Sequence, residues 1–167
     1  AQRTGLDRAR EIEVETPFDY QTQARLYLPL HLPSPSFSNR KRWQVAAMAE
    51  MAQLSDAALA TGKGVLMLCT SFAAVDAFAE ALEEVAAKHG VRVLKDRSKP
   101  KNELIAEAKR LRRFILVASQ GFWTGVDLPN VLALVGIDKA PLPTPDDPVA
   151  TGLRELYVAT GVCEQRD

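Results

Sequence analysis

The chain is poor in the residues that build metal centres and disulfide frameworks. Its 167 residues include only two cysteines and two histidines. Cys69 and Cys163 lie far apart and neither has a partner at metal-ligand spacing, so we expect no disulfide framework and no metal site. His31 and His89 also lack spaced partners and are interpreted as surface residues. The expected setting is reduced and cytoplasmic.

An excess of one charge and long apolar runs are also missing. Basic and acidic residues number 21 each, so any nucleic-acid site must be a local feature. No apolar run approaches the roughly 20 residues of a membrane span, and the first ten residues lack the apolar core of a signal peptide. We therefore expect no membrane partner. Because the chain does not begin with Met, we expect it to be part of a longer protein.

What is present is an alternation of short apolar runs and helical stripes. The runs predict strands, and apolar residues at every third or fourth position predict helices. This order predicts an α/β fold with a mostly parallel sheet covered by helices on both faces. Residues 1–40 are expected to form an entry segment that packs on a single domain, 41–167. The predicted strands are 24–30, 65–69, 91–94, 114–118 and 131–137, and the predicted helices are 41–60, 72–90, 101–113 and 148–160.

Ligands in such sheets gather where strands end. Four loops follow predicted strands and are expected at that edge: 70–72, 95–100, 119–130 and 138–147. In the first of them, Thr70 and Ser71 are good helix caps. The same hydroxyls could seat a phosphate at the start of the following helix, so both interpretations stand. "ATGKG" (60–64) is not a phosphate-binding loop, because it ends a helix and lacks the required Ser or Thr.

A basic segment forms the strongest local charge. Residues 92–113 carry nine basic and three acidic side chains, so their net charge is 9 − 3 = +6. This is either a solvated helix face or a track for a phosphate backbone, for which Arg110 and Arg113 are candidates. The nine basic residues are Arg92, Lys95, Arg97, Lys99, Lys101, Lys109, Arg110, Arg112 and Arg113.

The stretch "GFWTGVDLPN" (121–130) places an aromatic pair in a loop. Phe122 and Trp123 do not fall on a periodic face, although a packed pair at an ordinary turn would explain them. Gly125 permits a positive φ or a close backbone approach. Asp127 could accept hydrogen bonds from a ribose or orient a basic side chain. The pair Asp146–Asp147 is interpreted as a helix cap rather than an acid–base dyad.

The run "GFWTGVDLPNVLALVGIDKAPLPTPDDPV" resembles motif V and its continuation in DinG/XPD-type helicases of superfamily two. The family pattern is roughly S-F-W-E-G-V-D-x-P-G, followed by an apolar strand and D-K-L-P-F. "VLMLCTSFAAVDAFAEAL" (65–82) resembles motif IV, and "TPFDYQTQARLYLPLHLP" (16–33) resembles the segment that leads into this domain. The resemblance spans about residues 5–150 in the family order.

The resemblance implies the second RecA-like motor domain, a three-layer sandwich, of an ATP-dependent DNA helicase with a role in DNA repair. ATP and magnesium would be shared with an absent first RecA-like domain, which often carries an iron–sulfur cluster that two cysteines cannot supply here. Alone, this chain is expected to be inactive. Implied coupling residues are Gly125 and Asp127; implied nucleotide contacts are Trp123, Gly125 and Asp127; and implied contacts to single-stranded DNA are Thr70, Ser71, Phe72 and Phe122.

The chain departs from the family pattern at several positions. Thr124 stands in place of the usual Glu, Gly121 in place of Ser, and Leu142 in place of Phe. Motif VI, Q-x-x-G-R-x-I-R, is not found. These departures support an alternative, a non-catalytic single-strand-binding or regulatory remnant of such a helicase. An unrelated small-molecule α/β enzyme has no nucleophile–base pair or metal cluster to support it.

Overall fold

A computed structural model describes residues 12, 14–140 and 148–159. The chain divides into two units, Ala1–Leu32 and Pro33–Asp167, which are described separately. In the first unit, Asp19 caps the one-turn helix α1 (Tyr20–Gln23) by accepting a hydrogen bond from the Gln21 amide at 3.2 Å. The prediction of a strand at 24–30 is wrong, because none of these residues is in a strand. Its alternating leucines are exposed, and no strand among the described residues pairs with them. The packing of residues 1–40 on the domain stays a prediction.

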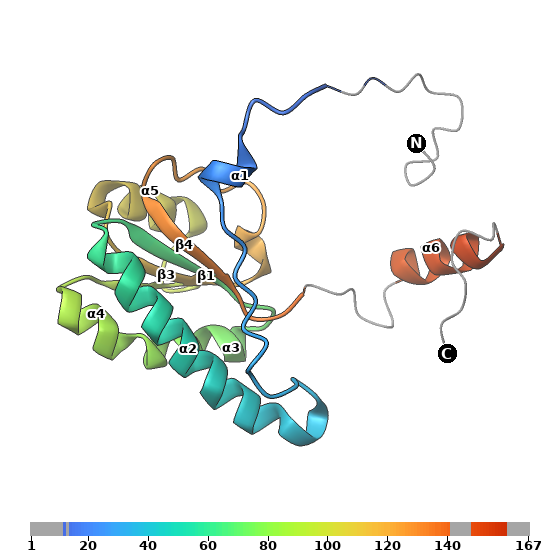
Figure 1. The fold of residues 1–167 in the computed structure, drawn as a ribbon, viewed down its shortest axis with the longest axis horizontal. Coiled ribbons are helices and arrows are strands. Elements are labelled where there is room, and N and C mark those ends of the chain that lie inside the picture. The colour runs from blue at the N-terminus through green and yellow to red at the C-terminus, as the bar shows by residue number, and fades with distance from the viewer. Residues whose placement is uncertain (1–11, 13, 141–147, 160–167) are drawn as a thin grey trace. The chain divides into compact units, whose positions relative to one another are not determined.

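The second unit contains a four-stranded sheet in which every strand is parallel to its neighbours (Figure 1). The strand order is β2-β3-β1-β4, so β1 and β3 are central. The α/β fold with a parallel sheet is confirmed and is consistent with a RecA-like domain. The strands are β1 (Gly64–Leu68), β2 (Val93–Lys95), β3 (Ile115–Ala118) and β4 (Leu132–Ile137).

Helices cover both faces of this sheet, as predicted. α5 lies on one face and α2, α3 and α4 lie on the other (Figure 1). The short 3-10 turn η2 (Phe37–Asn39) precedes α2, and α6 forms where a last helix was predicted. Among the described residues, no helix has the length and apolar character needed to cross a membrane. The bounds are α2 (Arg40–Ala60), α3 (Phe72–Ala81), α4 (Glu83–His89), α5 (Lys101–Leu111) and α6 (Pro148–Ala159).

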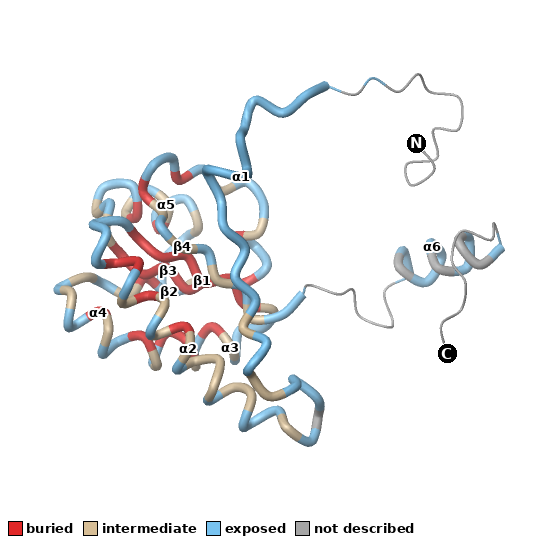
Figure 2. Tube along the Cα trace, in the orientation of Figure 1, coloured by how far each residue is buried: buried red, intermediate tan, exposed pale blue. Residues whose placement is uncertain are grey.

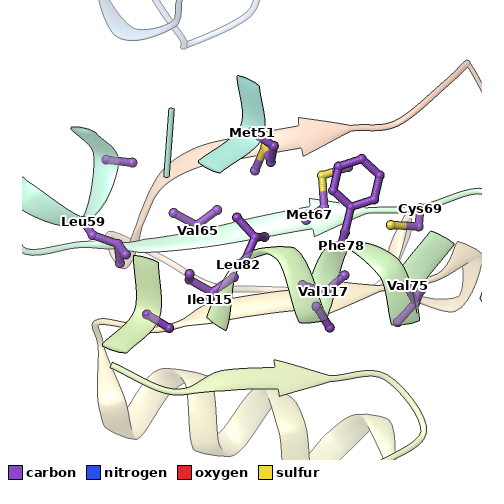
Figure 3. Close-up of a cluster of buried hydrophobic side chains, with 13 residues drawn as sticks. Met51, Leu59, Val65, Met67, Cys69, Val75, Phe78, Leu82, Ile115 and Val117 are labelled. Carbon is purple, nitrogen blue, oxygen red and sulfur yellow. The ribbon is translucent and has the colours of Figure 1, made fainter. Parts of the chain in front are cut away.

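The hydrophobic core has two layers because successive strand residues point to opposite faces. Val65 and Met67 of β1 face α2 and α3, where they meet Phe78 and Leu82 (Figure 3). Leu66 and Leu68 face the layer of α5. All five residues of β1 are therefore buried, which explains its unbroken apolar run. Figure 2 shows this buried centre in red.

The segment predicted as one helix after β1 forms two. α3 ends at Ala81 and α4 begins at Glu83, with Leu82 as the cap between them. α4 ends at His89 and is capped by Gly90, which has a φ of 62°. The break carries neither Gly nor Pro, the usual sequence signals for a helix end. Phe72 is the first residue of α3, and it is 48% exposed.

The continuous apolar run at 131–137 is typical of a buried strand, but β4 is not buried. Its residues alternate between half-buried and exposed because it lies at an edge of the sheet. Leu134 and Gly136 face the layer of α2, whereas Val135 and Ile137 are 50% and 54% exposed. All six residues of β4 are apolar, so the sequence hides the alternation.

The connection from β3 to β4 takes the place normally filled by a crossover helix. Residues 119–131 contain only the 3-10 turn η3 (Gln120–Phe122). They pass over β1 on the α5 face and end where Val131 accepts a hydrogen bond from the Gly64 amide at 2.7 Å. The segment expected to lie at the carboxyl ends of the strands therefore does so only at its start. The loop beyond 140, with Leu142, Asp146 and Asp147, lies outside the described residues.

Candidate nucleotide and nucleic-acid interface

A residue that follows the carboxyl end of β1 is hydrogen-bonded to a carboxylate that follows β4. Asp138 accepts two hydrogen bonds from Thr70, one from the amide and one from the hydroxyl, each at 3.0 Å. The Thr70 hydroxyl, a candidate phosphate donor, therefore already has an acceptor. Ser71 accepts a hydrogen bond from the Ala74 amide at 3.2 Å, which confirms its role as the cap of α3.

The exit of β3 is held in the same way by a carboxylate from the end of β2. Asp96 accepts hydrogen bonds from both the amide and the hydroxyl of Ser119. In both cases an outer strand supplies the aspartate and an inner strand supplies the hydroxyl residue. The loops that resemble motifs IV and V therefore both begin with a residue that is hydrogen-bonded to an aspartate, at the carboxyl ends of the strands.

Lys101, at the start of α5, contacts the next part of the segment 119–131, which we call the motif V loop. Its ammonium donates to the carbonyl of Gly121 at 2.6 Å and to that of Thr124 at 2.9 Å. It also lies 5.4 Å from the centre of the Phe122 ring. Gly125 has a φ of 67°, in the left-handed region that favours glycine, and a Cβ there would lie 3.7 Å from the same ammonium.

The loop encloses a shallow cavity of about 380 Å³ against the sheet. Trp123 is half-buried, and its indole N–H is buried without a hydrogen-bond partner among the described residues. Gly125 and Asp127 also line the cavity, together with Leu66, Leu68, Phe122, Val126, Leu128, Pro129, Leu132 and Val135. Because this lining has one carboxylate and no cationic side chain, it does not by itself fit a nucleoside triphosphate.

The basic segment is largely engaged by its own domain. Glu107 accepts hydrogen bonds from Lys99 at 2.7 Å and from Arg92 at 3.1 Å, and these two partners, Lys99 foremost, lower the pKa of its carboxyl. Lys95 pairs with Asp76 at 3.0 Å, and Lys109 lies 3.3 Å from Asp127. Most of the charge that suggested a phosphate track therefore has an intramolecular partner.

Arg110 and Arg113 are not brought to the edge that carries Thr70 and Ser71. They lie at and after the end of α5, near the amino end of β3. Arg113 donates to the Leu59 carbonyl at 3.2 Å and to His89 Nδ1 at 2.8 Å. Arg110 is exposed. The contact of either residue with DNA stays a prediction.

The interpretation of His89 as a surface residue is wrong, since its side chain is only 13% exposed. Arginine can only donate, so Nδ1 of His89 must accept from Arg113. In the neutral ring, Nε2 then carries the hydrogen and donates to Asp56 at 2.6 Å. This cluster joins α2, α4 and the start of β3, on the side of the sheet away from the motif loops.

Phe72 and Cys69, which flank Thr70 and Ser71, also bear on the predicted chemistry. The guanidinium of Arg97 lies 4.5 Å from the centre of the exposed Phe72 ring, so Phe72 meets a cation within its own chain. Cys69 is fully buried, and burial with the nearby Asp138 charge raises the pKa of its thiol to about 12. No group of metal-ligating side chains is found within the described ranges.

Sequence reasoning did not predict the contacts of Asp96, Asp138 and Lys101. Each makes its contact across 20 or more residues of sequence, so no local spacing reveals the pair. One signal was available. Asp96 and Asp138 each directly follow an outer strand, and polar residues at strand ends are the positions where α/β sheets place functional groups.

The fold is consistent with a RecA-like domain, and comparison with known proteins gives the family. Residues 54–162 match the family described as helicase C-terminal domain, so the chain belongs to that family. It is 34% identical over 148 residues to the ATP-dependent DNA helicase YoaA of Escherichia coli, covering 88% of this chain and 22% of that protein. The ATP-dependent helicase DinG of Mycobacterium tuberculosis is 28% identical over 153 residues, covering 91% and 22%.

The YoaA protein of Haemophilus influenzae is 29% identical over 150 residues, covering 89% of this chain and 22% of that protein. The chain therefore spans about a fifth of the length of these curated relatives. No solved structure matches it. The helicase C-terminal domain predicted from motifs IV and V is thus confirmed as the family of this chain.

Proposed function

We propose that this chain is the second motor domain of a DinG-type ATP-dependent DNA helicase. In this role it would complete an ATP cleft and a single-strand DNA track together with a first RecA-like domain. The observation that carries the proposal is the common edge: the loops that begin at Thr70 and Ser119 leave neighbouring parallel strands side by side. Motifs IV and V therefore begin on one surface, as a shared interface requires.

The residues of the motif V loop support unequal roles. Trp123 and Gly125, with the backbone around them, line a cavity that lacks cationic groups. ATP and magnesium would have to be held mainly by the first domain, with the motif V loop as the opposing wall. Asp127, whose side chain is 82% exposed, is available for coupling at the cost of its weak contact with Lys109.

Single-stranded DNA would meet the start of α3. The Ser71 cap leaves free amide groups in the first turn, and the end of a helix where such groups point outward favours phosphate. Phe72 is exposed and could stack on a base if Arg97 moved aside to pair with a phosphate. We infer that Thr70 supports this site through Asp138 and does not donate to DNA itself. The DNA-repair role rests on the family resemblance, and the cytoplasmic setting rests on the scarcity of cysteines.

The test is a comparison of the isolated chain with the full-length protein that carries it. The isolated chain should hydrolyse no ATP, while the full-length protein should show hydrolysis stimulated by single-stranded DNA. In the full-length protein, Asp127→Ala should lower ATP-coupled unwinding while the melting temperature stays unchanged. DNA-stimulated turnover by the 167 residues alone would contradict the proposal.

A non-catalytic single-strand-binding remnant is the second candidate, and Thr124 in place of the usual Glu favours it. Single-strand binding by the full-length protein without any ATP hydrolysis would support this candidate. In either case, the salt dependence of binding counts the phosphate contacts. A slope that is unchanged when Arg110 and Arg113 are reversed in charge would remove both from the interface.

A further inference from the structure

The basic segment and the motif V loop form one unit, held by three contacts in sequence order. Asp96 holds Ser119 at the start of the loop, Lys101 holds Gly121 and Thr124 in its middle, and Lys109 meets Asp127 further on. The loop therefore runs alongside the segment from the end of β2 through α5. These contacts account for basic residues that a phosphate track would have left pointing to solvent.

Lys101 makes the central contact, and most of its hydrogen-bond donors are used within the chain. An ammonium has three N–H donors and no acceptor. Two donors are used by carbonyl oxygens at 2.6 and 2.9 Å, and the Phe122 ring lies 5.4 Å away. Phe122 is 3% exposed, so the ring beside the ammonium belongs to the packed core. A lysine with these contacts restricts the backbone conformation of the loop whose carbonyl groups it binds.

Lys101 also stands where helix electrostatics would not place it. It is the first residue of α5, where the helix dipole favours acidic side chains. The two carbonyl contacts compensate for this placement, because hydrogen bonds from a charged donor are roughly twice as strong as neutral ones. The position is thus explained by the loop that it holds and not by the helix that it begins.

We propose that Lys101 is the positioning residue of the motif V loop: it sets the backbone of residues 121–125, and through it the places of Trp123 and Gly125. The inference rests on the proposed function for its effect on ATP hydrolysis. The ordering of the loop can be measured without that function.

The first test uses the 167-residue chain and three variants. Lys101→Met should speed hydrogen exchange at the hydrogen-bonded amides of Phe122 and Trp123 about tenfold or more, the equivalent of losing hydrogen bonds to a charged group. Lys101→Arg keeps the charge and donors and should restore most of the protection. Lys95→Met is the matched control, because it removes the same charge from a residue that pairs with Asp76. If Lys101→Met leaves exchange unchanged, the inference is overturned.

The second test measures DNA-stimulated ATP hydrolysis in the full-length protein. A misplaced loop should lower kcat about tenfold or more while KM for ATP changes little, and Lys101→Arg should recover kcat. Faster exchange with unchanged kcat would overturn the positioning role. If the parent protein hydrolyses no ATP, the proposed function fails, while the exchange comparison still decides whether Lys101 orders the loop. Should Lys101→Met fail to fold, Lys101→Gln, which keeps two donors without the charge, takes its place in both assays.

Discussion

At the scale of single residues, two strand glycines meet very different neighbours. A Cβ at Gly64 would lie 2.8 Å from the ring of Phe114, which is fully buried. A Cβ at Gly136 would lie 2.7 Å from Met51 and 2.9 Å from Met67, but the atoms that it meets are the flexible ends of methionine side chains. Gly64 therefore packs against a rigid neighbour, and Gly136 packs against neighbours that can change conformation.

We predict that Gly64→Ala lowers the free energy of unfolding by about 1–3 kcal/mol, because the phenylalanine ring cannot move without opening the core. Gly136→Ala should cost less than about 1 kcal/mol, since methionine can choose another rotamer. Urea unfolding of both variants measures the difference. Equal costs would show that the ring of Phe114 yields as easily as the two methionines.

The residue scale also shows what local sequence reasoning can reach. Ser71 was identified as a cap because the signal lies within three residues of its partner. Asp138 and Lys101 were missed because their partners are 68 and 20 residues away. His89 was misjudged for the same reason, since Asp56 and Arg113 lie on other elements.

At the scale of elements, the cluster around Asp56 joins α2 to α4. Hydrogen bonds from Lys88 and then from His89 lower the pKa of the Asp56 carboxyl. A lowered pKa in the folded state means that this contribution is present above the ordinary carboxyl pKa and is lost as the pH falls through the lowered value. The stability of the α2–α4 contact should therefore decline in acid.

We predict that Asp56→Asn lowers the melting temperature at pH 6–7, and that this difference shrinks as the pH falls below about 4, the ordinary range of an aspartate. Asparagine keeps an acceptor oxygen but not the charge, so the variant isolates the charge. Thermal unfolding across pH 2–7 measures the effect. A difference between the two proteins that stays constant over this range would contradict the assignment.

Elements were predicted well where burial is two-sided and poorly where it is not. The runs of β1 and β3 are continuous because helices or loops cover both faces. Residues 24–30 carry an alternating pattern without a partner strand in the described structure. For β4 the reverse holds, since six apolar residues conceal an exposed edge. Pairing partners, which composition does not encode, decide these cases.

At the scale of the whole molecule, β4 leaves one side of the sheet open among the described residues. Val135 and Ile137 expose half of their side chains there. Unprotected edge strands with apolar side chains promote pairing between chains. We predict that the isolated chain self-associates as its concentration rises, and that Ile137→Lys reduces the association.

Sedimentation velocity over a concentration series measures this association. Leu30→Lys, a change at a leucine that is 91% exposed in the other unit, is the matched control and should leave the series unchanged. Equal reductions by both variants would show that general hydrophobicity, and not the β4 edge, drives association.

The motif V loop, which connects β3 to β4, restricts how this domain can be redesigned. Phe122, Leu128 and Val131 anchor it in the core with 3%, 9% and 7% exposure. A loop that also serves as a layer of the fold cannot be shortened, lengthened or exchanged like a surface turn. Substitutions in this segment are tolerated best at exposed positions such as Thr124 and Asp127, whereas its buried side chains must be treated like those of a core helix.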